Sequence, residues 1–125
     1  IYRILPMANE LTLTATLKFS KSTKNADVGK SGLQLDVTGG DYITKTQVVG
    51  TSQEAVVIGE ITTPGYMFIR NLDGTNYIEI RDGSSGADVV KVRAGGIALF
   101  ELATATPFAI ANTASCEVEY TIIEV

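Results

Sequence analysis

Strict alternation of apolar and polar side chains over residues 11–19 is the feature that most constrains how this chain can fold. The apolar members recur every second position, with Thr or Lys between them: Leu11, Leu13, Ala15, Leu17 and Phe19. A repeat of two places successive side chains on opposite sides of an extended strand, whereas a helix repeats about every 3.6 residues. The pattern therefore predicts a half-buried β-strand.

The rest of the chain is rich in residues that favour strands. Val, Ile and Thr account for 11, 12 and 15 of the 125 residues, and β-branched side chains pack well on pleated sheets but lose rotamer freedom in helices. No long segment has a helical period. Further strands, each bounded by Gly, Asp, Asn or Pro, are predicted at residues 33–37, 42–49, 55–58, 66–70, 77–81, 89–93, 97–102, 108–111 and 116–124.

Many short strands without intervening helices indicate an all-β fold. We expect an antiparallel β-sandwich, jelly-roll-like, of about 8–10 strands with little or no helix. An immunoglobulin-like sandwich is the alternative, weakened by the absence of Trp and of a Cys pair. A chain of 125 residues fits one domain, and we assign residues 1–9 to an N-terminal arm and residues 10–125 to a single β-sandwich domain.

Three segments rich in Gly, Asp, Asn and Ser lie between the later strand patterns, at residues 71–76, 82–86 and 94–96. Such residues supply the backbone conformations of tight turns. We therefore expect three consecutive hairpins, which would make the second half of the chain a meander.

The first six residues differ in character from the rest of the chain. They are mostly apolar, and a small polar segment separates them from the first strand. An apolar tail on a small domain can pack on a neighbouring chain, so we predict an assembly arm formed by Ile1, Tyr2, Ile4 and Leu5.

Two absences exclude most enzyme chemistry. The chain has no His and a single Cys, Cys116, so one chain cannot form a Ser-His-Asp or Cys-His catalytic set, a His-Cys zinc site or an internal disulfide. The alternation of residues 116–122 places Cys116 in the core. We expect a protein that is not an enzyme and has no cofactor or metal.

Charge and hydropathy narrow the partners. The net charge is −4 and the pI is about 4.7, which disfavours nucleic acid and anionic membranes. No apolar run approaches the roughly 20 residues that span a bilayer, and no signal peptide is evident, so we expect a soluble, unprocessed chain.

Three motifs have residue types that could support chemistry, but none predicts a site. Gly29-Lys30-Ser31 ends like a phosphate-binding loop, but the required earlier Gly is Lys24, so we expect a turn. The carboxylates and hydroxyls of residues 82–88 do not have EF-hand spacing, so we expect a hairpin loop. Glu117 and Glu119 share a strand face about 7 Å apart, yet the sequence offers no cleft or sugar platform around them.

Charge is also uneven along the chain. Four Lys residues lie in the first third, whereas residues 94–125 hold no Lys or Arg and four acids: Glu101, Glu117, Glu119 and Glu124. Solvated strand faces and loops are the ordinary interpretation. The alternative is electrostatic complementarity between copies of the chain or with a partner.

Residues 46–125, about two-thirds of the chain, carry a running pattern of strand and turn signatures. The pattern reads QVVGT (47–51), EA (54–55), PGYMFIRNLD (64–73), TNYIEI (75–80), VKVRAGGIALF (90–100), AIANTA (109–114) and EVEYTIIE (117–124). In this pattern the chain resembles a group of small tailed-bacteriophage virion proteins.

The resemblance implies a β-sandwich structural component of a virion, assembled in the host cytoplasm. Within that class we favour a capsid decoration or cement protein that binds the head shell in multiple copies, with a tail or fibre component as the alternative. The expected partners are the major capsid protein or another virion protein, and further copies of the chain, with a trimer favoured. The family has no active site to carry over.

A carbohydrate-binding module is the alternative from another class, because jelly rolls often host sugar sites. The candidate stacking residues are Tyr42, Tyr66 and Tyr77. Exposure of these tyrosines on one sheet face would favour sugar binding, whereas an exposed apolar patch would favour assembly.

Overall fold

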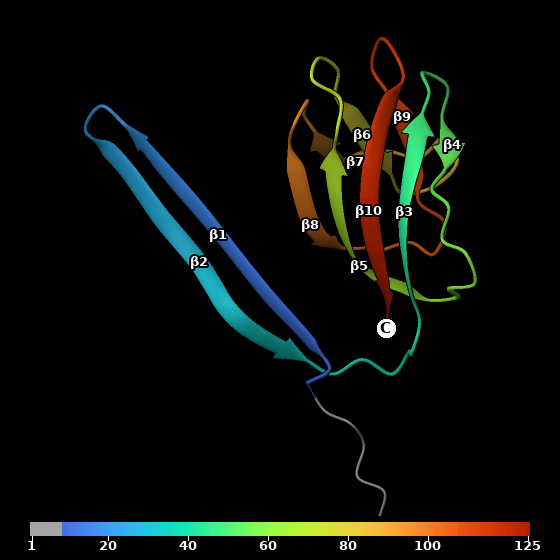
Figure 1. The fold of residues 1–125 in the computed structure, drawn as a ribbon, viewed down its shortest axis with the longest axis horizontal. Coiled ribbons are helices and arrows are strands. Elements are labelled where there is room, and N and C mark those ends of the chain that lie inside the picture. The colour runs from blue at the N-terminus through green and yellow to red at the C-terminus, as the bar shows by residue number, and fades with distance from the viewer. Residues whose placement is uncertain (1–8) are drawn as a thin grey trace, which may run out of the picture. The chain divides into compact units, whose positions relative to one another are not determined.

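In a computed structural model of the chain, residues 9–125 are described, and the chain divides into two compact units, Ile1–Thr38 and Gly39–Val125. The first unit is a hairpin of two long antiparallel strands, β1 (Leu11–Lys21) and β2 (Lys24–Leu35) (Figure 1). The predicted arm residues Ile1, Tyr2, Ile4 and Leu5 lie outside the described residues. The assignment of residues 1–9 to an arm and 10–125 to one domain stays a prediction.

The second unit is a sandwich of two four-stranded antiparallel sheets. One sheet has the order β3-β10-β5-β8 and the other the order β4-β9-β6-β7; Figure 1 shows the first sheet nearer the viewer. The eight strands are β3 (Tyr42–Val49), β4 (Glu54–Ala55), β5 (Pro64–Asn71), β6 (Ile78–Arg81), β7 (Asp88–Val92), β8 (Ile97–Glu101), β9 (Phe108–Ala111) and β10 (Cys116–Glu124). This is the strand order of a jelly roll, so the predicted all-β sandwich is confirmed.

Most strand bounds match the alternation of the sequence, with two exceptions. The segment predicted as a strand over residues 55–58 pairs with β9 only at Glu54–Ala55. After Ala55, the backbone N–H of Val57 donates to Oε1 of Gln47 at 3.1 Å. A side chain therefore takes the place of a neighbouring strand as the hydrogen-bond partner. The second exception is β2, which begins at Lys24 rather than at residue 33, because pairing with β1 holds a polar segment extended.

The predicted meander is wrong, because the chain changes sheet twice in that region. Strands β5 and β8 belong to one sheet and β6 and β7 to the other. Of the three predicted hairpin turns, the one between β6 and β7 is a hairpin, while residues 71–76 and 94–96 cross between the sheets. Turn residues signal that the chain bends there but not which sheet receives the next strand.

A buried amide joins the two crossing connections. Asn71 is 2% exposed, and its Nδ2 donates to the carbonyls of Asn76 at 2.9 Å and Val92 at 3.2 Å. Asp73 lies in the same turn and accepts from the backbone N–H groups of Thr75 and Asn76, which lower the pKa of its carboxyl. These side chains satisfy backbone groups that no strand partner reaches.

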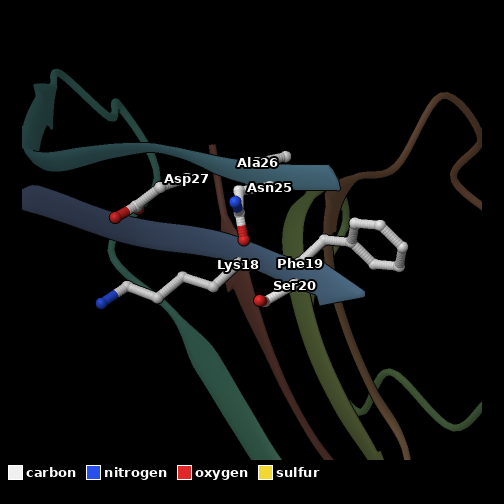
Figure 2. Close-up of a pocket in the computed structure, with 6 residues that line it drawn as sticks. All are labelled: Lys18, Phe19, Ser20, Asn25, Ala26 and Asp27. Carbon is white, nitrogen blue, oxygen red and sulfur yellow. The ribbon is translucent and has the colours of Figure 1, made fainter. Parts of the chain in front are cut away.

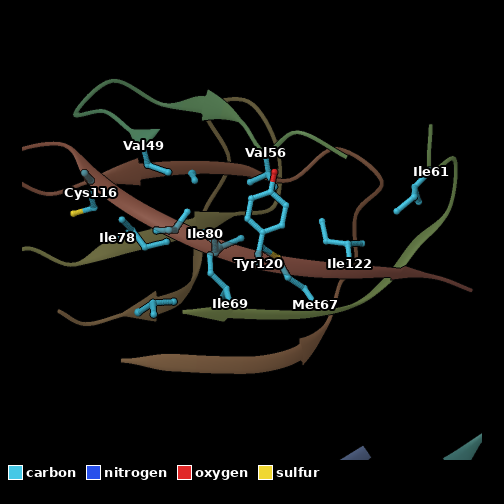
Figure 3. Close-up of a cluster of buried hydrophobic side chains, with 14 residues drawn as sticks. Val49, Val56, Ile61, Met67, Ile69, Ile78, Ile80, Cys116, Tyr120 and Ile122 are labelled. Atoms are coloured by element: carbon cyan, nitrogen blue, oxygen red, sulfur yellow. The ribbon is translucent and has the colours of Figure 1, made fainter. Parts of the chain in front are cut away.

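The core lies between the two sheets, and β10 contributes its largest member. The inward residues of β10 are Cys116, Val118, Tyr120 and Ile122, each no more than 2% exposed. Figure 3 shows the Tyr120 ring between the sheets. Its hydroxyl lies 2.6 Å from the carbonyl oxygen of Val57 and 3.0 Å from Oε1 of Gln47, and burial raises the Tyr120 pKa to about 12.

We predict that Tyr120→Phe lowers the free energy of unfolding by roughly 1–2 kcal/mol, because the buried Tyr120 side chain loses the hydrogen bond from its hydroxyl to the carbonyl of Val57. The folded pKa of Tyr120 is raised, so its contribution is present below pH 10 and is lost as pH rises from 10 to about 12. The difference between wild type and variant should therefore shrink across that range in urea unfolding. Tyr42→Phe, at an exposed tyrosine, is the control, and an equal loss there would contradict the assignment.

Candidate functional site: two apolar sheet faces

The two carboxylates singled out in the sequence lie on an exposed sheet face. Glu117 and Glu119 point outward from β10 on the same side of the sheet, as expected from their spacing. Oε1 of Glu119 lies 3.7 Å from Nη1 of Arg70, and both side chains are about half exposed. An exposed ion pair of this kind contributes little to stability.

The loop at residues 82–88 is the β6–β7 hairpin loop, as predicted. Oδ1 of Asp82 accepts from the N–H of Ala87 within the loop at 3.0 Å. Oδ1 of Asp88, the first residue of β7, accepts from Nε of Arg81 at the end of β6 at 2.8 Å. Across residues 9–125, no group of three or more His, Cys, Asp or Glu side chains is arranged to hold a metal ion.

Two other candidates occupy structural positions. The turn predicted at Gly29-Lys30-Ser31 is wrong, because this segment lies within β2, where backbone pairing with β1 keeps it extended. Cys116 is completely buried, as predicted, and burial raises the pKa of its thiol. A buried thiol without a depressed pKa is not a nucleophile.

No helix within residues 9–125 is long and apolar enough to cross a membrane.

The β1–β2 hairpin separates its side chains into an apolar and a polar face. Residues paired across the strands share a face, so Leu17 lies beside Val28 and Phe19 beside Ala26, while Lys18 lies beside Asp27 on the other side. We define the hairpin apolar face as Leu11, Leu13, Ala15, Leu17, Phe19, Ala26, Val28, Leu33 and Leu35; Lys21, Lys24 and Lys30 are the charged residues on the same side.

One extra residue in β2 creates this face. From Leu13 to Ala15 β1 advances two residues, while β2 advances three between the partners Leu33 and Lys30. The bulge inverts the alternation of β2, so that Leu33 and Leu35 join the side of Val28. Gly32 sits in the bulge at φ +67°, a conformation that Gly adopts readily, and its N–H donates to Oγ1 of Thr14 at 3.0 Å.

Most of the hairpin apolar face is exposed. Leu17 is 66% exposed, Val28 57% and Phe19 50%, so the prediction of a half-buried strand is wrong beyond Leu13. The physical reason is that a sheet of two strands has no second layer of its own. Figure 2 shows the end of the hairpin, with the Phe19 ring pointing away from the side chains of Lys18 and Asp27, which help to line a shallow hollow.

Two hydrogen bonds close the base of the hairpin. The N–H of Asn9 donates to Oδ1 of Asp36 at 2.6 Å, and the N–H of Val37 donates to Oε2 of Glu10 at 3.2 Å. They extend the pairing beyond both strands and fix the point where the hairpin joins residue 38.

A second apolar surface lies on the outer side of the β3-β10-β5-β8 sheet. Strand pairing places Ile123 between Tyr42 and Tyr66, and Phe68 beside Leu99. We define the sheet apolar face as the seven apolar residues that point outward from this sheet: Tyr42, Val48, Tyr66, Phe68, Ile97, Leu99 and Ile123.

The outer side of the other sheet is more charged. Tyr42 and Ile97 are each 65% exposed, whereas the paired outward residues of β6 and β7 are the charged pairs Glu79 with Lys91 and Arg81 with Asp88. The apolar residues on that side are Phe108 and Ile110 of β9 and the exposed Val89. Charged residues are the ordinary composition of a solvated sheet face, and contiguous apolar residues mark interaction sites.

The three candidate tyrosines do not share a face. Tyr42 and Tyr66 belong to the sheet apolar face, and partial burial with the nearby Glu101 carboxylate raises the pKa of Tyr66. Tyr77 precedes β6 in the other sheet, with Nζ of Lys91 4.1 Å from its ring centroid. Lys91 therefore occupies one face of the Tyr77 ring.

Alternation along single strands indicated that the hairpin and the sheet each have an apolar side. It does not show which side of a strand is covered by another sheet. In β5, Tyr66 and Phe68 look as able to face inward as Met67 and Ile69 until the pairing with β10 is known. No protein-family model matches the chain, and no curated protein matches it either.

Deletion of Gly32 should remove the bulge and return Leu33 and Leu35 to the side of the threonines. We expect nuclear Overhauser contacts between Leu13 and Leu33 to disappear while contacts within residues 42–124 persist. Gly32→Asn is the matched control, because Asn tolerates positive φ and keeps the residue count. Retention of the Leu13–Leu33 contacts after the deletion would show that the bulge does not set the face.

Proposed function

We propose that this protein is a non-enzymatic structural component of a tailed-bacteriophage virion, a capsid decoration protein that binds the head shell in multiple copies. The observation that carries the proposal is the pair of exposed apolar faces on one small β protein. Such faces are costly to leave in water and indicate assembly with other protein surfaces. The resemblance of residues 46–125 to phage virion proteins supports the choice of assembly.

The proposed partners are the major capsid protein, or another virion protein, and further copies of the chain in a closed trimer. A symmetric shell repeats the same attachment surface many times. Copies that also bind one another gain affinity from simultaneous attachment, because each later contact forms at a high effective concentration. A tail or fibre component would use the same self-association and differ in its attachment point.

A carbohydrate-binding module is a second candidate, favoured by one observation. Tyr42 and Tyr66 both point outward from the same sheet, with Phe68 beside them in the sheet apolar face. Aromatic rings on a flat surface can stack on sugar rings. Tyr77, on the other sheet, takes no part in this arrangement.

Addition of the purified protein to shells that lack it tests the decoration function. We expect saturable binding at a fixed number of copies per shell. Leu17→Asp, on the hairpin apolar face, should raise the concentration for half-saturation by about tenfold or more, since it weakens multivalent attachment. Thr16→Asp, on the polar face of the hairpin, is the matched control.

Folded protein that does not cosediment with shells at high concentration would overturn the decoration function. Binding to tails rather than heads would select the tail component. For the sugar candidate, retention on an insoluble polysaccharide that is lost in Tyr42→Ala but kept in Tyr77→Ala would select the carbohydrate-binding module instead.

A further inference from the structure

We propose that the hairpin apolar face of one copy docks on the sheet apolar face of a second copy. This inference rests on the self-association part of the proposed function and names the two surfaces that carry it. It does not depend on a shell, so it can be tested on the purified protein alone.

Both faces are apolar sides of a sheet that no second layer covers in the described chain. A two-stranded hairpin is marginal in water at best, and β1, with 11 residues, is about 35 Å long at the usual rise per residue. The sheet apolar face lies on a four-stranded sheet whose other side is already buried. Docking would make the hairpin a third layer on this sheet, in the way that sheets stack face to face in sandwiches.

Charge favours this pairing over the stacking of two hairpins. The hairpin carries four Lys residues, and three of them, Lys21, Lys24 and Lys30, lie on the side of its apolar face. Two hairpins packed apolar face to apolar face would bring these like charges together. The outer side of the β3-β10-β5-β8 sheet instead presents three acids, Glu101, Glu117 and Glu119, and one cation, Arg70, which pairs with Glu119. The surplus of acids makes the charges of the two faces complementary.

The hinge favours exchange between copies over closure within one chain. On the hairpin side, the N–H of Val37 is bonded to Glu10. On the sandwich side, Gly39 packs so closely on the Glu124 side chain that a Cβ would overlap it, and the N–H of Glu124 donates to the carbonyl of Asp41 at 2.9 Å. Residues 38–40 are left between the hydrogen-bonded positions Val37 and Asp41, and short hinges promote exchange of an element between protomers.

Each copy has one hairpin apolar face and one sheet apolar face, so it can contact two other copies. A set of such copies closes either as a reciprocal pair or as a ring in which each hairpin reaches the next sandwich. The trimer favoured in the proposed function corresponds to a ring of three.

Crosslinking of mixed single-cysteine variants tests the contact. Leu17→Cys and Phe68→Cys, carried on chains of different tagged length, are mixed and treated with a short bismaleimide under native conditions; the natural Cys116 is fully buried and unreactive. We expect a covalent heterodimer. Two mixtures serve as controls: Leu17→Cys with Val89→Cys, which is exposed on the other sheet, and Thr16→Cys with Phe68→Cys.

Several outcomes would overturn the inference. These are equal yield in the control mixtures, linkage of Leu17→Cys mainly to itself, or linkage of Leu17→Cys with Phe68→Cys only when both lie in one monomeric chain. A wild-type protein that is monomeric by light scattering at high concentration would also overturn it.

A second measurement uses the mass in solution. Phe68→Glu should raise the dissociation constant of the oligomer by about tenfold or more, as expected for an anchor at the centre of an interface, while Val89→Glu should leave it unchanged. Thermal unfolding of both variants reports whether the sandwich is intact. If the protein crosslinks as expected but does not bind shells, the decoration function alone is overturned. If the protein binds shells but Leu17→Cys does not crosslink to Phe68→Cys, this inference alone is overturned.

Discussion

The apolar side of a β-sheet has to be covered by a second layer, and this requirement organises the structure of residues 39–125. Strand β10 lies inside its sheet between β3 and β5, and its inward row is covered by the opposite sheet. The hydroxyl of Tyr120 would be costly in such a core without partners, but Val57 and Gln47 supply them. The same two residues hold the segment after β4 in place of a longer strand.

The requirement is left unmet at two places in the described chain. The hairpin has the alternation of a core strand but only two strands, and the β3-β10-β5-β8 sheet has an apolar side that points away from the core. A bulge at Gly32 keeps the apolar residues of β2 on one side, although a purely solvated hairpin would gain nothing from it. These two exposed apolar surfaces are the observation on which the proposed assembly function rests.

Much of the fold could be predicted from local patterns. The bounds of β3, β9 and β10 match the predicted segments, because alternation and flanking turn residues are local properties of the chain. The polar half of β2 could not be predicted, since Lys24 to Ser31 has few apolar residues and is held extended by its partner strand. The predicted meander failed for a related reason: a turn signal shows where the chain reverses, but the burial of Asn71 against Asn76 and Val92 sends it across to the other sheet.

The sequence by itself determined that the protein is all-β, that it lacks His-based and disulfide chemistry, and that β1 has one apolar side. These conclusions come from composition and from the alternation of apolar and polar residues. Both are visible without knowing which strands pair. Tertiary structure alone decided which side of each strand is covered. Whether a side chain such as Phe68 or Leu17 is exposed depends on strand order and on the presence of a second layer, because burial is a property of neighbours that are distant in sequence.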